Sequence, residues 1–408
     1  MVRCLLSERA RGFYPLSFPL ISSSFNFKTF SKYTMQLTLF SRTNHPVMPT
    51  SQFPNLSRLS IGLPASDSLP TLTVGTTDTT DPTTTTTTTT LDFKAAFDLF
   101  ESGAVFSCRK GRITVTKSEL LSEAERQLVQ DLKQLRAQVD IPSTQSSESD
   151  FLAGSFNTGV FLSRSDEEGG LPAPFPYDLR RRLLDFSVSD SVFARFSIDQ
   201  FVYNKLYKPM DRNYNSVLEF MFQETFTTLF ASQLGLGVEI YAAFITTVVY
   251  KSERIPRLVF LQEAAIGDLT DFCSANTVTP RIQDRFLYTI YRISTAGLLL
   301  LDLKPGNMVY LQDDRGNVEF RAIDFGADFS VILDTNKFAP ECIMFANCLM
   351  FMSITCRIVN AGIKKPKNMS GYSKCLIQLA HPLFTFVESY LKSSFDSGTR
   401  RSFCSALL

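Results

Sequence analysis

The clearest alternation of apolar and polar residues lies between residues 177 and 265. Gly235 and Gly237 close a stretch, 216–237, that has the composition of a helix, and glycines are typical of a helix C-terminus. Around this helix, aromatic and β-branched residues alternate with polar ones, as is typical of strands. The predicted strands are 191–197, 201–207, 238–250 and 257–264.

Downstream of residue 265 the pattern becomes mostly helical. Residues 281–297 predict a long helix. Residues 307–311 and 318–323 predict a two-stranded ribbon that turns at 312–317. A strand-rich half followed by a helix-rich half indicates an α+β protein of two lobes.

The N-terminal part of the chain is polar and repetitive. Residues 1–90 are rich in Ser, Thr and Pro and end in a run of threonines, so we expect them to be a disordered low-complexity region. Residues 1–50 carry basic residues against one acid, Glu8. This bias resembles an organellar transit peptide, but it is equally typical of a basic tail or of an over-extended start upstream of Met35 or Met48.

A helical pattern follows at 116–139, where apolar residues recur at intervals of three and four. Thr116 and Glu119 have the spacing of a capping box, which predicts that the helix begins there. We therefore expect a helical extension at 91–141. Residues 142–176 return to Ser, Gly, Asp and Pro and predict a linker.

Composition limits the possible partners. The formal net charge of the 408 residues is +1, which gives no electrostatic reason to expect binding to nucleic acid or to an anionic membrane. The longest apolar stretch, 342–356, is shorter than the roughly 20 residues that cross a bilayer, so we interpret it as a buried core helix.

The reactive residue types also narrow the chemistry. The 8 cysteines are scattered, as expected for reduced thiols of an intracellular protein, cytoplasmic or nuclear. His45 and His381 are the only histidines. Any catalysis is therefore expected to depend on carboxylates, lysines or a bound metal.

One constellation carries such chemistry. A leucine run at 298–301 leads directly into Asp302, followed by Lys304 and, five residues after Asp302, Asn307. Residues 324–326 then read Asp-Phe-Gly. These two segments resemble the catalytic loop and the Asp-Phe-Gly motif of protein kinases.

The resemblance implies a role for each residue. Asp302 would orient the attacking hydroxyl and accept its proton, and Lys304 would neutralise charge on the transferred phosphoryl group. Asn307 and Asp324 would bind Mg²⁺, a hard ion that prefers oxygen ligands, and ATP would be the phosphoryl donor.

The resemblance also implies a bilobal fold at 177–408. A small β-rich N-lobe at about 177–263 would precede a helical C-lobe at about 264–408, which is reduced because the chain ends soon after Asp324. Backbone groups near Glu263 and Ala265 would hold the adenine edge.

Lys205 stands where the family has the lysine of Val-Ala-Ile-Lys, and Glu224 lies on the next helix. Their ion pair would place the ammonium over the phosphates. Lys208 and Glu219 are the alternatives, and all four are also compatible with solvated surface residues.

Three departures from the family pattern affect function. Leu300 and Leu301 replace the usual His-Arg, so regulation by loop phosphorylation is not expected. Serines at 187–191 stand nearest to the place of a glycine-rich loop. Ala339-Pro340-Glu341 matches the end of an activation segment, but the expected Asp-x-Trp-Ser-x-Gly is missing because the chain has no Trp.

Three functions remain open at this point. The first is a divergent serine/threonine kinase that phosphorylates a protein substrate, and the second is a pseudokinase that binds nucleotide or acts as a scaffold. The third is a small-molecule kinase of the same fold, although such enzymes usually have a histidine in the catalytic loop. The sequence does not indicate the oligomeric state.

Overall fold

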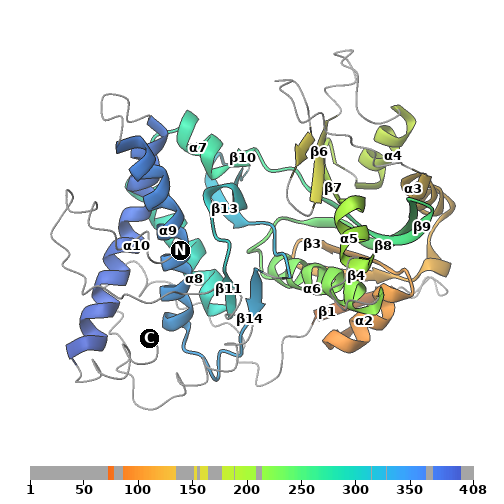
Figure 1. Ribbon diagram of the computed structural model, residues 1–408, viewed down its shortest axis with the longest axis horizontal. Coiled ribbons are helices and arrows are strands. Elements are labelled where there is room, and N and C mark those ends of the chain that lie inside the picture. The colour runs from red at the N-terminus through yellow and green to blue at the C-terminus, as the bar shows by residue number, and fades with distance from the viewer. Residues whose placement is uncertain are drawn as a thin grey trace. The chain divides into compact units, whose positions relative to one another are not determined.

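The computed structural model divides into two compact units, one β-rich and one mostly helical. The β-rich unit comprises Ser68–Ile266 and Arg321–Ser330, and the helical unit includes Gly267–Phe320 and Val331–Leu408. The two units agree with the predicted protein-kinase-like α+β fold (Figure 1). The residues that the structure describes are 72–77, 86–134, 151–153, 157–163, 177–187, 189–207, 214–313, 315–327, 329–363 and 371–396.

The β-rich unit is built on a nine-stranded sheet with the order β2-β1-β4-β3-β8-β9-β7-β6-β5. Neighbours run antiparallel except for β1 and β4, which are parallel. The strands are β1 (Leu72–Thr77), β2 (Thr86–Leu91), β3 (Val105–Arg109), β4 (Arg112–Thr116), β5 (Phe151–Ala153), β6 (Asn157–Ser163), β7 (Ser191–Ser197), β8 (Ile240–Tyr250) and β9 (Glu253–Glu263).

Helices pack on this sheet because alternate strand residues are apolar. Val160, Val192 and Leu261 are buried together with Leu183 and Leu184 of α4. The helical segments of the unit are α2 (Phe93–Glu101), η5 (Ser118–Leu120), α3 (Glu123–Gln134), α4 (Tyr177–Ser187), α5 (Asp199–Tyr207) and α6 (Tyr214–Gln233).

The prediction for the N-terminal region needs two corrections. Strands β1 and β2 pair within the stretch that we expected to be disordered, while the rest of 1–90 lies outside the described residues. The predicted helical extension contains helices α2 and α3, but a β-hairpin separates them, in which Val105 of β3 pairs with Thr116 of β4. Thr116 therefore belongs to a strand, and the capping box is formed by Ser122 and Glu125, which exchange hydrogen bonds at the start of α3.

The predicted linker at 142–176 contains β5 and β6, so the sheet begins before residue 177 and that domain boundary is wrong. β6 pairs with β7 along its full length, from Asn157 opposite Ser197 to Ser163 opposite Ser191. The strand is short and lies in a Ser- and Gly-rich stretch, so its pattern was too weak to detect. Its pairing partner, which is distant in sequence, stabilises it.

Residues 201–207 were predicted as a strand but form helix α5. The aromatic and β-branched residues of this segment favour a strand, but tertiary contacts override the strand propensity of so short a segment. Asp199 in the first turn of α5 is held by a buried salt bridge, in which Arg257 donates from Nε at 3.1 Å and from Nη2 at 2.6 Å. This pair fixes the start of the helix against β9.

The helical unit packs α8, α9 and α10 around aromatic side chains. The ring of Phe286 contacts those of Phe320 and Phe351, with centroids 5.4 and 5.1 Å apart. The elements are β10 (Gly267–Asp268), α7 (Leu269–Ala275), α8 (Pro280–Thr295), β11 (Leu298–Leu300), η7 (Pro305–Asn307), β12 (Met308–Gln312), β13 (Val318–Ala322), β14 (Ser330–Ile332), α9 (Pro340–Ile363) and α10 (Gly371–Asp396).

The sequence predicts the helices and strands of the helical unit more accurately than those of the β-rich unit. Helix α8 and the paired strands β12 and β13 confirm the predicted helix and ribbon. The apolar stretch at 342–356 lies in α9, where Ile343, Cys348 and Phe351 are buried. Of the helices in the described ranges, not one combines the length and the apolar content that crossing a bilayer requires.

We expect Asp199→Ala to lower the free energy of unfolding by about 3–5 kcal/mol, because it removes the carboxylate that binds the buried guanidinium of Arg257 through two nitrogens. Chemical denaturation of the full chain measures this change. Asp98→Ala is the matched control, since the Lys94–Asp98 pair is exposed and should contribute less than about 1 kcal/mol. Equal effects of the two substitutions would contradict the prediction.

Candidate active site

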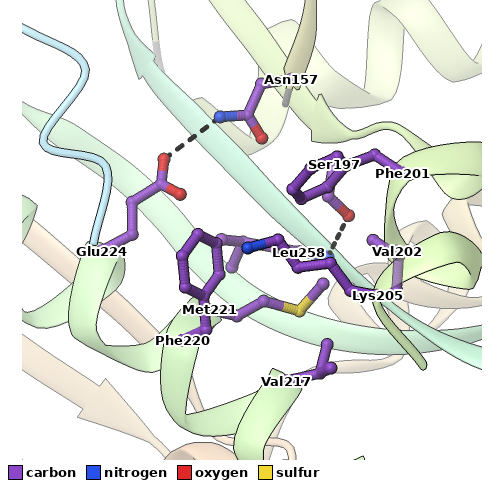
Figure 2. A pocket seen from close by; sticks show the side chains of 10 residues that line it. All are labelled: Asn157, Ser197, Phe201, Val202, Lys205, Val217, Phe220, Met221, Glu224 and Leu258. Carbon is purple, nitrogen blue, oxygen red and sulfur yellow. Dashed lines mark hydrogen bonds between the residues drawn. The ribbon is translucent and has the colours of Figure 1, made fainter. Parts of the chain in front are cut away.

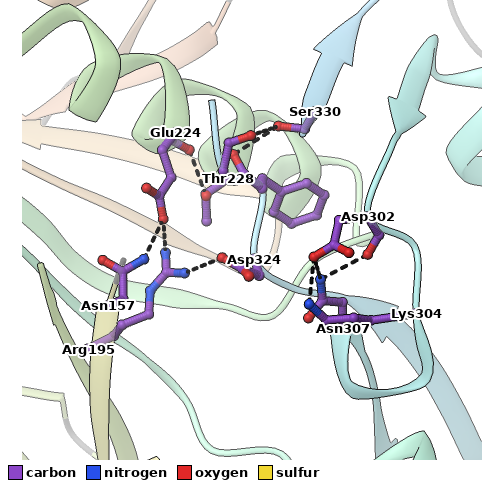
Figure 3. Close-up of polar contacts among 11 residues, drawn as sticks. Asn157, Arg195, Glu224, Thr228, Asp302, Lys304, Asn307, Asp324 and Ser330 are labelled. Carbon is purple, nitrogen blue, oxygen red and sulfur yellow. Dashed lines mark hydrogen bonds and ion pairs between the residues drawn. The ribbon is translucent and has the colours of Figure 1, made fainter. Parts of the chain in front are cut away.

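In the β-rich unit, three charged side chains meet at Arg195 of β7 (Figure 3). Its Nη2 atom lies 2.8 Å from Oε1 of Glu224 on α6, and its Nη1 atom donates to Oδ1 of Asp324 at 3.4 Å. Only about 10% of the Arg195 side chain is exposed, and Glu224 is buried. The arrangement brings one positive charge between two carboxylates.

The surroundings hold the guanidinium of Arg195 in a fixed orientation. Its Cζ atom lies 4.4 Å from the ring centroid of Phe260 on β9, a cation–π contact. Asn157 of β6 donates from Nδ2 to Glu224 Oε1 at 3.2 Å. The buried Nε of Arg195 has no hydrogen-bond partner among the described residues.

Burial and charge act in opposite directions on Glu224. Desolvation is the largest influence and raises the pKa of the carboxyl group, and the nearby Asp324 raises it further. Arg195 and the hydrogen bond from Asn157 lower it, but they do not fully offset burial. The proton affinity of Glu224 therefore depends on its ion pair remaining closed.

Asp324 has a strained backbone. Its φ is 61°, in the left-handed region that residues other than glycine seldom adopt. Phe325 is buried next to it, and Ser330 Oγ donates to the carbonyl oxygens of Phe325 and Gly326 at 2.8 and 3.0 Å. Strain of this kind persists where surrounding contacts fix the chain, and it is common at functional sites.

The predicted Lys205–Glu224 pair is wrong. Lys205 lies on α5 and its Nζ atom lies 3.8 Å from the ring centroid of Phe220, in a small pocket that Met221 and Glu224 also line (Figure 2). Of the alternatives, Glu219 is exposed, and Lys208 lies outside the described residues.

Arg195 is the functional candidate that the sequence analysis missed. Residues Val192 to Arg195 read Val-Phe-Ala-Arg, which parallels Val-Ala-Ile-Lys with arginine in place of lysine. The available signal was an arginine at the end of this four-residue match, on a strand that precedes the helix of Glu224 in the chain.

The serines at 187–191 do not form a loop over the site. Ser187 ends α4 and Ser191 begins β7, so the expected position of a glycine-rich loop was wrong. The hairpin that precedes β7 in the sheet is β5–β6, and the residues that connect those strands lie outside the described part of the chain.

The segment at the end of β9 is held by hydrogen bonds to Glu263. Its Oε2 atom accepts from the backbone N–H of Glu239 and from Nη1 of Arg321, each at 3.1 Å. The Glu263 side chain is therefore engaged in supporting the strand. The role of backbone groups from Glu263 to Ala265 in adenine binding stays a prediction.

In the helical unit, the loop after β11 brings together the two predicted catalytic residues, Asp302 and Lys304, and the predicted metal ligand Asn307. Lys304 Nζ lies 2.6 Å from Asp302 Oδ2, and Asn307 Nδ2 donates to Asp302 O at 2.9 Å and to Oδ2 at 3.1 Å (Figure 3). These bonds use the amide nitrogen of Asn307 and so orient its oxygen as an acceptor. Oxygen ligands of this kind fit Mg²⁺.

Asn347 on α9 anchors the strand that leads into this loop. Its Oδ1 accepts from Leu300 N at 2.9 Å, and its Nδ2 donates to Leu298 O at 2.9 Å and to Ser294 Oγ at 3.1 Å. The side chain is fully buried. A polar residue within an apolar helix was the signal that the sequence analysis did not use.

The segment after Asp324 is short, as expected. Ala339 precedes α9, which begins at Pro340 with Glu341 in its first turn. No separate helix lies between Gly326 and Pro340 among the residues that are described there.

The described residues contain no group of three or more His, Cys, Asp or Glu side chains placed to hold a metal ion. Asn307 belongs to the helical unit and Asp324 to the β-rich unit. Their joint binding of Mg²⁺ stays a prediction.

Comparison with known proteins gives little further information. No family model and no curated protein matches the chain. Among solved structures, one match is a divergent kinase that lacks the glycine-rich loop and regulates membrane ultrastructure of the Toxoplasma parasitophorous vacuole. The identity is 11% and the TM-score 0.32, over 73% of this chain and 85% of that chain. A similarity this low adds no argument to the geometry above.

We expect Glu224→Gln to flatten the pH dependence of stability above pH 4.5. The raised pKa means that the folded state binds more protons than the unfolded state between 4.5, the ordinary value, and the raised pKa. The free energy of unfolding should therefore fall as the pH rises through that interval, and glutamine removes this contribution. Urea denaturation at a series of pH values measures the slope, with the exposed Glu219→Gln as the matched control. An unchanged slope in Glu224→Gln would contradict the assignment.

We expect Asn347→Ala to destabilise the helical unit by about 1–3 kcal/mol or more, because it leaves buried groups of β11 without hydrogen bonds. Hydrogen exchange at residues 298–307 should accelerate. Asn276→Ala, at the exposed end of helix α7 in the same unit, is the control and should leave that exchange unchanged. Equal protection in both variants would argue against an anchoring role.

Proposed function

We propose that this chain is a divergent phosphotransferase of the protein-kinase type, which transfers the γ-phosphate of ATP to a serine or threonine hydroxyl of a protein. The observation that carries the proposal is the contact of Arg195 with both Glu224 and Asp324. A basic residue on a strand, a buried acid on the adjacent helix and the Asp of Asp-Phe-Gly are the elements that phosphoryl transfer in this family requires.

In this proposal Arg195 binds the phosphates of the nucleotide. Glu224 and Phe260 fix its guanidinium, so little side-chain freedom is lost when a phosphate oxygen binds. Arginine forms planar, two-point contacts with phosphate where lysine provides a point charge.

Asp302 would act as the base that accepts the proton of the substrate hydroxyl. Its carboxylate is held by Lys304 and Asn307, which keep it oriented. On transfer, Lys304 would stabilise the negative charge of the phosphoryl group. Asn307 and Asp324 would hold Mg²⁺, which supplies positive charge to the nucleotide phosphates when bound.

One observation favours a second candidate, a pseudokinase that binds nucleotide without transferring phosphate. Arg195 donates to Oδ1 of Asp324, so part of the proposed metal ligand is already engaged by a cation of the chain itself. A permanently charged guanidinium at this position competes with Mg²⁺ for the carboxylate. The two candidates agree on nucleotide binding and differ in transfer.

The proposal predicts that Mg·ATP raises the melting temperature of the full chain and that Asp302→Asn lowers the rate of phosphate transfer by about 10²–10⁴-fold without weakening nucleotide binding. Thermal denaturation and transfer of labelled γ-phosphate to a mixture of proteins measure the two effects.

Asp284→Asn, an exposed substitution on α8 of the same unit, is the matched control and should keep full transfer. Nucleotide binding without transfer in the unaltered chain would select the pseudokinase. No stabilisation by millimolar ATP would exclude both candidates, and unchanged transfer in Asp302→Asn would show that the base is misassigned.

A further inference from the structure

A cluster of aromatic rings joins the N-terminal part of the β-rich unit to α6. The ring of Phe222 on α6 lies 4.9 Å from that of Phe93, 5.4 Å from that of Phe97 and 5.2 Å from that of Phe100, measured between centroids. Phe106 of β3 completes the cluster at 6.4 Å. Phe222 is fully buried by these contacts.

Phe222 and Glu224 point in different directions from the same helix. Two residues correspond to about 200° of rotation, so a helix that presents Phe222 to α2 presents Glu224 to the opposite side. That side carries Arg195 at 2.8 Å. Helix α6 is therefore held between the aromatic cluster and the ion pair.

A second group of contacts holds the C-terminal end of α6. Gln233, its last residue, donates from Nε2 to the carbonyl oxygen of Thr73 at 3.2 Å. A Cβ atom at Gly111 would lie 3.0 Å from the carbonyl oxygen of Gln233, so this turn approaches the helix end closely. The segments before α3 thus contact α6 near its middle, at Phe222, and at its C-terminal end, at Gln233.

The same N-terminal strands are joined to the sheet. β3 pairs with β8, with Phe106 opposite Ala243 and Cys108 opposite Ile240. The backbone N–H of Lys110 donates to Glu239 Oε1 at 2.8 Å. Helix α2 is consequently attached to a rigid sheet, and its position against α6 does not depend on the ring contacts alone.

We propose that residues 86–116 are a built-in positioning element for α6, and that Phe93 and Phe97 hold Glu224 against Arg195 through Phe222. The proposal deepens the proposed function, on which it rests for its effect on nucleotide binding. The contact of Phe93 and Phe97 with Phe222 lies within one chain and would keep Glu224 next to Arg195 without a partner protein.

The geometry explains why this contact matters for the site and not only for stability. An ion pair of 2.8 Å opens when α6 shifts by one or two ångströms, and a buried Glu224 without its partner is costly. Phe93 and Phe97 are partly exposed, so their removal loosens α6 without opening the centre of the core.

The test uses the full chain with Phe97→Ala, with Phe97→Leu as the conservative variant. Hydrogen exchange of the α6 amides should accelerate about tenfold in Phe97→Ala and remain within about twofold of the unaltered chain in Phe97→Leu. Phe345→Ala removes a ring that stacks on Tyr390 in the helical unit and is the matched control, which should leave α6 unchanged.

A double-mutant cycle with Glu224→Gln then separates positioning from general destabilisation. The dissociation constant for ATP should rise about tenfold in Phe97→Ala alone and by less than about twofold when Phe97→Ala is added to Glu224→Gln, because the ion pair is then already lost. Equal effects in both backgrounds would overturn the proposal.

Unchanged α6 exchange in Phe97→Ala would overturn it as well. Absence of ATP binding in the unaltered chain would exclude the proposed function, whereas the exchange measurement would still decide whether residues 86–116 position α6.

Discussion

The β-rich unit depends on compensation of one buried positive charge. Arg195 lies on an interior strand of the sheet with little exposure to water, where an unpaired guanidinium would be strongly destabilising. Glu224 and Asp324 provide the compensation, and Phe260 adds a cation–π contact. Strand β7, helix α6 and the Asp-Phe-Gly segment are therefore coupled, because the guanidinium comes from the strand and the two carboxylates come from the helix and the segment.

The helical unit solves a comparable problem with a neutral residue. Its β11 strand is short, and the backbone groups at its end face the interior, where water does not satisfy them. Asn347 supplies both a donor and an acceptor, so a single amide anchors the strand that carries Asp302. The loop residues Lys304 and Asn307 then orient Asp302 from the other side.

Local patterns predicted the helical unit better than the β-rich unit, for physical reasons. Helix α8 has Thr279 as its N-cap and apolar residues at helical spacing, and the β12–β13 ribbon closes on a tight turn, so both are specified by neighbours in sequence. Strands β5 and β6 are specified by pairing with β7, which a sequence pattern does not reveal. The motif favours Lys205 by residue type alone, whereas the sheet register, which places Arg195 opposite Phe260, determines the partner of Glu224.

Strands β1 to β4, which precede α3 and are called the extension here, also change which strands form the edges of the sheet. Without β3, the start of strand β8, from Ile240 to Ala243, would present unpaired N–H and C=O groups, and such an edge pairs readily with other polypeptides. The extension moves the border outward to the threonine-rich strand β2. A shortened form that starts after β4 would consequently be prone to self-association, so the extension protects solubility in addition to supporting α6.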